Sequence, residues 1–326
     1  MKHPAIIANG IKRDYAVMRN WQRNTMTINK FMIRQSCLLF LTALIWGVAF
    51  VAQSAGLEYV QPFTFNAVRC MIGGVVLIPF IGILKLYKKE PVRQDEQKMQ
   101  RKTLYKGGII CGILLFIASN LQQFGIQYTT VGKAGFLTAL YIIIVPFLGI
   151  FLHRRVGKKV WFGVVFALCG LYLLCIKEDF RLAIGDALMI MCAFAFSFHI
   201  MVIDCFSPKV ESVKMSCIQF FVCGILSAIC MFIFEQPQIS QILAAWQPIL
   251  YAGVMSCGVA YTLQIAAQEG MNPTVASLIL SMESVFSVLA GWLLLHETLS
   301  RKELAGCLLM FIAIILAQLP QKQESA

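Results

Sequence analysis

The sequence predicts an all-α polytopic membrane protein with ten transmembrane helices, arranged as two inverted five-helix repeats. Three observations support this fold class. The 326-residue chain is 59% hydrophobic and only 13% charged, its apolar residues gather in ten long runs, and its two halves repeat one pattern. Because an amide without a hydrogen-bond partner is costly in lipid, segments that cross the bilayer are expected to be helical.

The ten apolar runs extend over nearly the whole chain after a basic N-terminal segment. Each is close to the length of about 20 residues that a helix needs to cross roughly 30 Å of hydrocarbon. Most connections between the runs are short, so successive helices are expected to lie antiparallel and closely packed. We expect the spans at residues 36–55, 63–86, 105–125, 131–152, 158–177, 185–204, 213–234, 246–268, 273–295 and 302–319.

The repeat is visible when one half is shifted onto the other by about 143 to 150 residues. The matching positions are His153 and His296, Gly163 and Gly306, Arg69 and Gln219, and Trp46 and Phe196. Because each half holds an odd number of spans, the second copy must lie inverted in the membrane. We expect a basic tail (1–35), a first repeat (36–177), a second repeat (178–319) and a short tail (320–326).

The charge distribution predicts the orientation. Of the 28 Lys and Arg residues, 22 lie in or beside the tails and loops on the cytoplasmic side if both termini are placed there. Four lie on the opposite side, at Lys177, Arg181, Arg301 and Lys302. This asymmetry follows the positive-inside rule and predicts a multi-pass protein of the cytoplasmic (inner) membrane, surrounded by lipid. The net charge of +12 therefore reflects membrane topology, and no nucleic-acid partner is expected.

The N-terminal segment and the cysteines suggest no further site. We expect residues 1–35 to form a disordered cytoplasmic tail without a cleavable signal peptide, and translation can begin at Met1 or at Met26. The twelve cysteines are scattered singly and lack the spacing of a zinc site or a disulfide framework. No metal and no cofactor are expected.

Several segments together resemble a known family over residues 37–319. The run LTALIWGVAFVAQSAG carries a Trp46–Gly47 pair, Arg69 follows in span two, and span nine contains SLILSMESVFSVLAGWLLLHETLS with Glu283. This arrangement is similar to the drug/metabolite transporter superfamily, whose EamA-type members carry two tandem EamA domains. One departure is Ser284, where the family usually has a proline, and it bears on the bend of span nine.

The resemblance implies a membrane carrier for a small metabolite, since many members export amino acids or related compounds. It also implies that spans three, four, eight and nine line a central cavity. Polar side chains mark the same four spans independently, because helical spacing places them on common faces. These candidates are Asn120, Gln123, Gln127, Thr138, Tyr141, Tyr261, Gln264, Gln268, Ser277, Ser281 and Ser284.

Two interpretations of these polar faces remain open. An unpaired buried polar group costs about 1–3 kcal/mol, so the faces should point to the interior and could line a cavity. They could instead form hydrogen bonds between helices, at about 0.6 kcal/mol per contact.

Charged and titratable residues within the spans are the remaining candidates. Glu283 lies near the middle of span nine and could bind a cationic substrate group, exchange a proton for coupling, or pair with Arg69. Arg69 could hold a substrate carboxylate, pair, or snorkel toward the surface. His199 could titrate near neutral pH or be a packed residue, and we expect Lys133 to snorkel.

The sequence therefore predicts a secondary active transporter that exports a small polar metabolite by alternating access of its two halves. The alternatives are a membrane-embedded enzyme and a non-transporting sensor or scaffold. An enzyme is less expected, because the chain lacks a zinc-protease motif and a nucleophile elbow. The substrate, the coupling ion, the direction and the choice between a monomer and a homodimer stay open.

Overall fold

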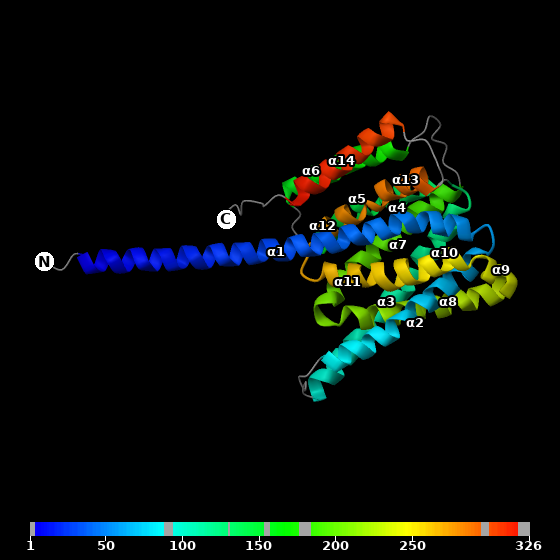
Figure 1. The fold of residues 1–326 in the computed structure, drawn as a ribbon, viewed down its shortest axis with the longest axis horizontal. Helices are drawn as coiled ribbons and strands as arrows, with labels where there is room; N and C mark the ends of the chain where they lie inside the picture. Colours follow the sequence, from blue (N-terminus) through cyan, green and yellow to red (C-terminus); the bar gives the residue numbers. More distant parts are fainter. Residues whose placement is uncertain are drawn as a thin grey trace.

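The computed structural model describes residues 4–87, 94–129, 131–152, 157–175, 184–294 and 300–318, all of it helices and short connections (Figure 1). This confirms the all-α polytopic membrane class. The first half contains α1 (Pro4–Gly56), α2 (Pro62–Tyr87), α3 (Gln94–Ile126), α4 (Val131–Thr138), α5 (Tyr141–Phe151) and α6 (Lys158–Cys175). The second half contains α7 (Ile184–Phe206), η1 (Ser207–Lys209), α8 (Ser212–Phe234), α9 (Ile239–Ala244), α10 (Trp246–Leu250), η2 (Tyr251–Tyr261), α11 (Thr262–Gln268), α12 (Pro273–Leu280), α13 (Glu283–Leu294) and α14 (Arg301–Gln318).

Eight helical segments among the described residues are long and apolar enough to cross a membrane. They coincide with eight of the ten predicted runs. The fifth and tenth runs correspond to α6 and α14, whose apolar stretches are the shorter Val160–Leu173 and Leu304–Leu316. The count of ten transmembrane helices therefore stays a prediction. Residues 176–183, between the fifth and sixth predicted spans, and the matched pair His153 and His296 lie outside the described residues.

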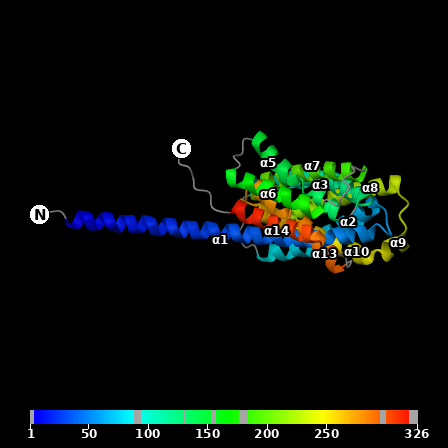
Figure 2. The same ribbon diagram turned by 90° about the horizontal axis from the view of Figure 1, so that it is seen from above.

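The N-terminal segment differs from the expectation of a disordered tail. Helix α1 begins at Pro4 and continues without interruption into the first span, so that it extends well beyond the bundle (Figures 1 and 2). Proline suits the first position of a helix. Between Pro4 and the first span, Gly10 is the only glycine and there is no further proline, and these are the two residue types that disfavour a helix most. The segment is therefore compatible with a helix although it is polar.

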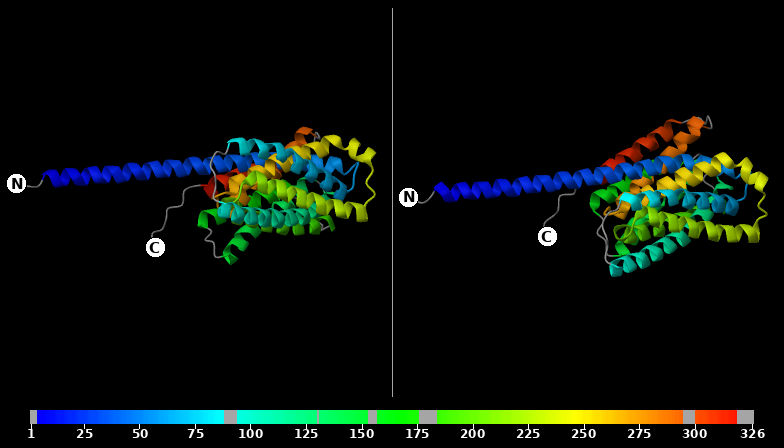
Figure 3. Two further views of the ribbon diagram at one scale, coloured as in Figure 1. Left: turned by 90° about the horizontal axis from the view of Figure 1, so that it is seen from below. Right: turned by 60° about the horizontal axis from the view of Figure 1, so that its bottom comes forward.

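The two halves pack in a reciprocal way. Helix α2 packs against its counterpart α8, and α6 packs against α14. Helix α3 packs against α7, just as the counterpart of α3, formed by η2 and α11, packs against α1 (Figure 3). Likewise α4 and α5 contact α7, as α12 and α13 contact α1. Exchanging the two halves leaves this packing scheme unchanged.

Spans four and nine are both interrupted near their middles. Span four breaks at Ala139 and Leu140, between α4 and α5, and span nine breaks at Ser281 and Met282, between α12 and α13. The Ser281 hydroxyl donates to the Leu278 carbonyl at 2.7 Å, the acceptor that Met282 would use in a regular helix. The Met282 amide donates to the Ile279 carbonyl instead. Span nine therefore breaks without the proline that the family usually carries.

Candidate functional site

A cavity lies where the two halves meet, with about 440 Å³ of space not filled by protein atoms. This volume includes open solvent and the gaps between lining atoms, so the enclosed space is much smaller. Spans one to four, six, eight and nine all contribute. The lining residues are Trp46, Ala49, Phe50, Gln53, Arg69, Gln122, Thr138, Tyr141, Phe196, Ile200, Ser256, Tyr261, Gln264, Leu280 and Glu283.

Most of the lining comes in symmetry-related pairs. The two helix breaks are 142 residues apart, and this shift also relates lining positions on spans three and eight and on spans four and nine. The corresponding shift between spans one and six is 150 residues. The pairs are Gln122 and Gln264, Thr138 and Leu280, Tyr141 and Glu283, Trp46 and Phe196, and Phe50 and Ile200. The cavity is therefore lined by equivalent positions of the two halves and belongs to neither half alone.

At the cavity wall, a hydrogen bond joins Tyr141 of span four to Glu283 of span nine. Tyr141 is the first residue of α5 and Glu283 is the first residue of α13. The Tyr141 hydroxyl donates to Oε1 of Glu283 at 2.9 Å, and both side chains are buried. Because Glu283 lies in the first turn of α13, the dipole of that helix stabilises its carboxylate.

Arg69 also lines the cavity but does not pair with Glu283. Its side chain is 4% exposed, and its guanidinium carbon lies 5.5 Å from the centroid of the Phe65 ring. Among the residues that the structure describes, no ion pair or hydrogen bond partner of Arg69 occurs. Of the alternatives for Glu283, pairing with Arg69 is therefore not observed.

The structure brings six of the predicted site residues to the cavity wall and leaves eight elsewhere. Those at the wall are Arg69, Thr138, Tyr141, Tyr261, Gln264 and Glu283. Those elsewhere are Asn120, Gln123, Gln127, His199, Gln268, Ser277, Ser281 and Ser284.

The two buried amides of span three that do not line the cavity bond to other helices. Asn120 bonds to Asn66 at 2.9 Å and to Ser227 at 3.2 Å, and Gln123 donates to the Gln53 carbonyl at 3.1 Å. Gln127 lies beyond the end of α3 and is exposed. Each of these bonds joins helices, which is the second interpretation of the polar faces.

The serines of span nine serve the break and the helix packing. Ser277 and Ser281 donate to carbonyls three residues earlier, and Ser284 donates to the Gly135 carbonyl on α4 at 2.9 Å. A Cβ at Gly135 would lie 2.9 Å from the Ser287 hydroxyl, so α4 and α13 approach each other closely there.

His199 lies behind the cavity wall. Its Nε2 lies 3.1 Å from Oε1 of Gln219. Its ring packs edge-to-face against the ring of the lining residue Tyr261, with 5.9 Å between the two ring centroids. It is fully buried and contributes to the wall through Tyr261. Span eight presents Tyr261 at the end of η2, an 11-residue π-helical segment, which is a feature that often occurs at functional sites.

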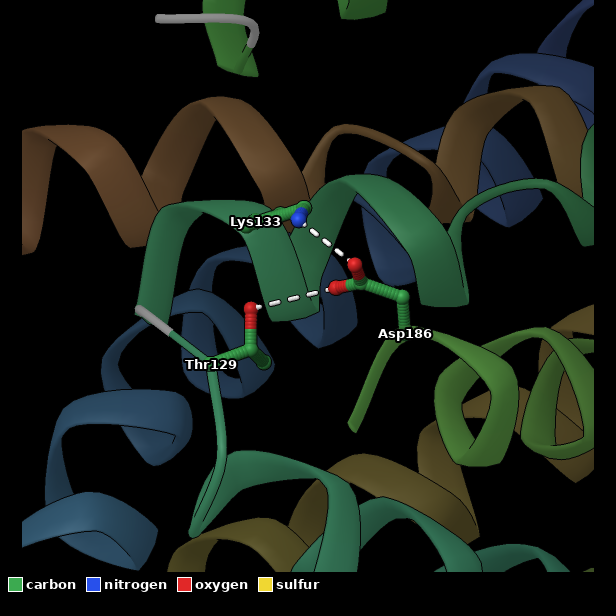
Figure 4. A network of polar contacts seen from close by, with 3 residues as sticks. All are labelled: Thr129, Lys133 and Asp186. Carbon is green, nitrogen blue, oxygen red and sulfur yellow. Dashed lines mark hydrogen bonds and ion pairs between the residues drawn. The ribbon is translucent and has the colours of Figure 1, made fainter. Parts of the chain in front are cut away.

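We expected Lys133 to snorkel toward the membrane surface, but in the structure it pairs with a carboxylate. Its Nζ lies 2.6 Å from Oδ2 of Asp186, and Thr129 lies 3.5 Å from the other carboxylate oxygen (Figure 4). The Asp186 side chain is fully buried, and Lys133 is mostly buried. This contact joins the start of α4, the first part of broken span four, to the start of α7.

A multi-pass helical bundle with a polar cavity shared between two similarly packed halves defines the class of membrane transporters. The chain belongs to the EamA-like transporter family, which matches residues 34–176 and 183–319. EamA-type proteins are part of the drug/metabolite transporter superfamily, so the resemblance seen in the sequence is confirmed.

Relatives and a solved structure agree with this assignment. A protein of Archaeoglobus fulgidus named as an uncharacterized transporter is 30% identical over 283 residues, covering 86% of this chain and 84% of that protein. The uncharacterized transporter YoaV of Bacillus subtilis is 23% identical over 292 residues, covering 87% of this chain and 97% of the relative. A crystal structure that is 19% identical superposes with a TM-score of 0.70, covering 88% of this chain and 96% of that chain, which shows a shared fold.

Proposed function

We propose that the chain is a secondary active transporter of the cytoplasmic membrane, with both termini cytoplasmic. It exports a small polar metabolite, such as an amino acid or a related compound, by alternating access. The observation that carries this proposal is the position of the cavity at the junction of two broken helices, one from each half. Transporters built from inverted repeats commonly bind substrate at such breaks near the bilayer midplane.

The reciprocal packing supports a rocking mechanism. Because exchanging the halves leaves the helix contacts unchanged, two conformations related by this exchange have similar packing. Each would expose the shared cavity to a different side of the membrane. The Tyr141–Glu283 hydrogen bond lies between the halves and would be remade or broken as they move.

Glu283 is the residue that we assign to coupling. It is the acidic side chain of the cavity wall, and its carboxyl oxygen is already bonded to a donor from the other half. Binding a proton or a cationic group at this carboxyl would change that bond. The state of Glu283 would therefore change the relation of the two broken helices, which is what coupling requires.

The test is metabolite flux into liposomes that contain the purified full-length protein. Gln264→Ala and Glu283→Gln should each lose uptake or counterflow, because both side chains line the cavity. The matched control is Gln127→Ala, which removes an exposed amide outside the cavity and should transport normally. Intact flux in both cavity variants would remove the site assignment.

A further inference from the structure

Arg69 is a buried cation in the cavity wall without a counter-charge in contact. It lies seven residues after the start of α2, which places it about 10 Å below the outer end of that helix. At 4% exposure its side chain does not reach the surface by snorkelling. Its Nε has no hydrogen-bond partner, and no ion pair joins Arg69 to any residue that the structure describes.

The visible compensation for this charge is small. A charged side chain within the hydrocarbon layer is costly unless it has a partner. The contact of the guanidinium with the Phe65 ring offsets only part of that cost. By contrast, Lys133 at the start of α4 forms an ion pair with Asp186. The difference indicates that the guanidinium is kept for a partner that is not part of the protein.

The surrounding wall is suited to the oxygens of an anion. A second N–H donor, Nε1 of Trp46, is also buried in the cavity wall and unpartnered. The guanidinium can offer two parallel N–H groups, a geometry that matches a carboxylate. The same wall presents apolar surface through residues such as Phe50, Phe196 and Leu280. It also carries the carboxyl group of Glu283, which accepts a hydrogen bond from Tyr141.

We propose that Arg69 binds the carboxylate of the transported molecule, while the aromatic and aliphatic wall holds an uncharged, apolar body. This inference rests on the proposed transport function and specifies its substrate class as small organic monocarboxylates. Such a molecule can be a simple carboxylate or can also carry an amino group. In the second case, the side-chain oxygens Oε1 of Gln53 and Gln264, which have no hydrogen-bond partner within the described part of the chain, are acceptors for its N–H groups.

Four probes of one shape separate these chemistries: L-leucine, 4-methylpentanoate, L-leucinamide and 3-methylbutylamine. The first two carry a carboxylate and the last two do not, whereas 4-methylpentanoate alone lacks nitrogen. Each is titrated to millimolar concentrations against the purified full-length protein, with the shift in melting temperature as readout. The same probes are then assayed for counterflow in liposomes. The variants are Arg69→Gln, Arg69→Lys and the control Lys214→Gln, which removes a partly exposed cation paired with Glu211.

We expect at least one of the two carboxylate probes to raise the melting temperature of the wild type. The two probes without a carboxylate should not raise it. Arg69→Gln should weaken the carboxylate effect about tenfold or more, as expected for a lost charge-assisted hydrogen bond. Arg69→Lys should keep part of it, and Lys214→Gln should keep all of it. Ligand-free Arg69→Gln should melt no lower than the wild type, because it removes an uncompensated charge. A purely structural arginine would give the opposite result.

The pattern of stabilisation across the four probes identifies the substrate class. Stabilisation by 4-methylpentanoate alone identifies a simple carboxylate, and stabilisation by L-leucine alone identifies an amino acid. Equal shifts from amide and carboxylate, carboxylate shifts that survive Arg69→Gln, or no shift from either carboxylate would overturn the proposal. Counterflow of a neutral or cationic compound that Arg69→Gln leaves intact would refute the carboxylate site but retain the transport function.

Discussion

The hydrogen bond between Tyr141 and Glu283 provides the sharpest prediction about the site. Tyr141→Phe removes one hydroxyl, keeps the ring in place, and leaves Oε1 of Glu283 without its observed donor. Burial makes this costly, because a hydrogen bond to a charged group contributes about 1.5–3 kcal/mol and one between neutral groups about 0.5–1.5 kcal/mol. We therefore expect Tyr141→Phe to lower the free energy of unfolding by about 1–3 kcal/mol.

A double-mutant cycle isolates this bond from other effects. Tyr141→Phe, Glu283→Gln and the double variant are unfolded reversibly in mixed detergent micelles, and the three losses of stability are compared. Residues in direct contact usually show a coupling energy of about 0.5–3 kcal/mol. If the two single losses add within about 0.3 kcal/mol, the bond does not join the two halves and this reasoning fails.

Three further predictions concern the helix packing. Gly47→Ala should destabilise the fold by about 1–3 kcal/mol in a melting assay, because its Cβ would overlap a phenylalanine of α13, whereas Gly82→Ala meets no atom within 4 Å and should be neutral. Lys133→Met should cost about 3 kcal/mol, because it removes the cation that pairs with the buried Asp186 carboxylate. Adding Asp186→Leu should recover part of this loss, and equal losses in both variants would contradict the pairing. Glu235→Gln should cost about 1–2 kcal/mol, since this carboxylate accepts two amide N–H groups and a hydroxyl from the first turn of α2; unchanged unfolding would rule out such a cap.

The sequence predicts the fold class and the central acidic residue for clear physical reasons. Long apolar runs have few alternatives to membrane helices, and the intramembrane Glu283 is costly unless it has a specific environment. Tyr141 and Gln264 were candidates because polar groups avoid lipid, and the structure places both at the cavity wall.

The cavity face of span three was predicted one residue out of register. The spacing of polar residues placed Gln123 on the cavity face, whereas the structure lines the cavity with Gln122, which lies 142 residues before its counterpart Gln264. One residue turns a helix by about 100°, so Gln123 bonds to the Gln53 carbonyl instead. The spacing of polar residues alone does not determine, to within one residue, which side of a helix faces a cavity.

The apolar part of the wall left no polar signal to follow. Phe50, Phe196, Ile200 and Leu280 look like ordinary packing residues in the sequence, and the cavity becomes apparent only from the positions of the helices. The repeat did contain a usable hint, because it aligned Trp46 with Phe196 and the structure places both at the wall. Similarly, the serine spacing of span nine indicated a polar face, while the structure assigns those hydroxyls to the helix break.

The most direct test asks whether the shared cavity opens to both sides of the membrane. Ser256→Cys places one thiol at the cavity wall in a cysteine-free background that still transports. In sealed vesicles of both orientations, a membrane-impermeant thiol reagent should label this cysteine from either face, and a transported carboxylate should slow the labelling. No labelling from either face, or labelling from one face only under all conditions, would contradict the account.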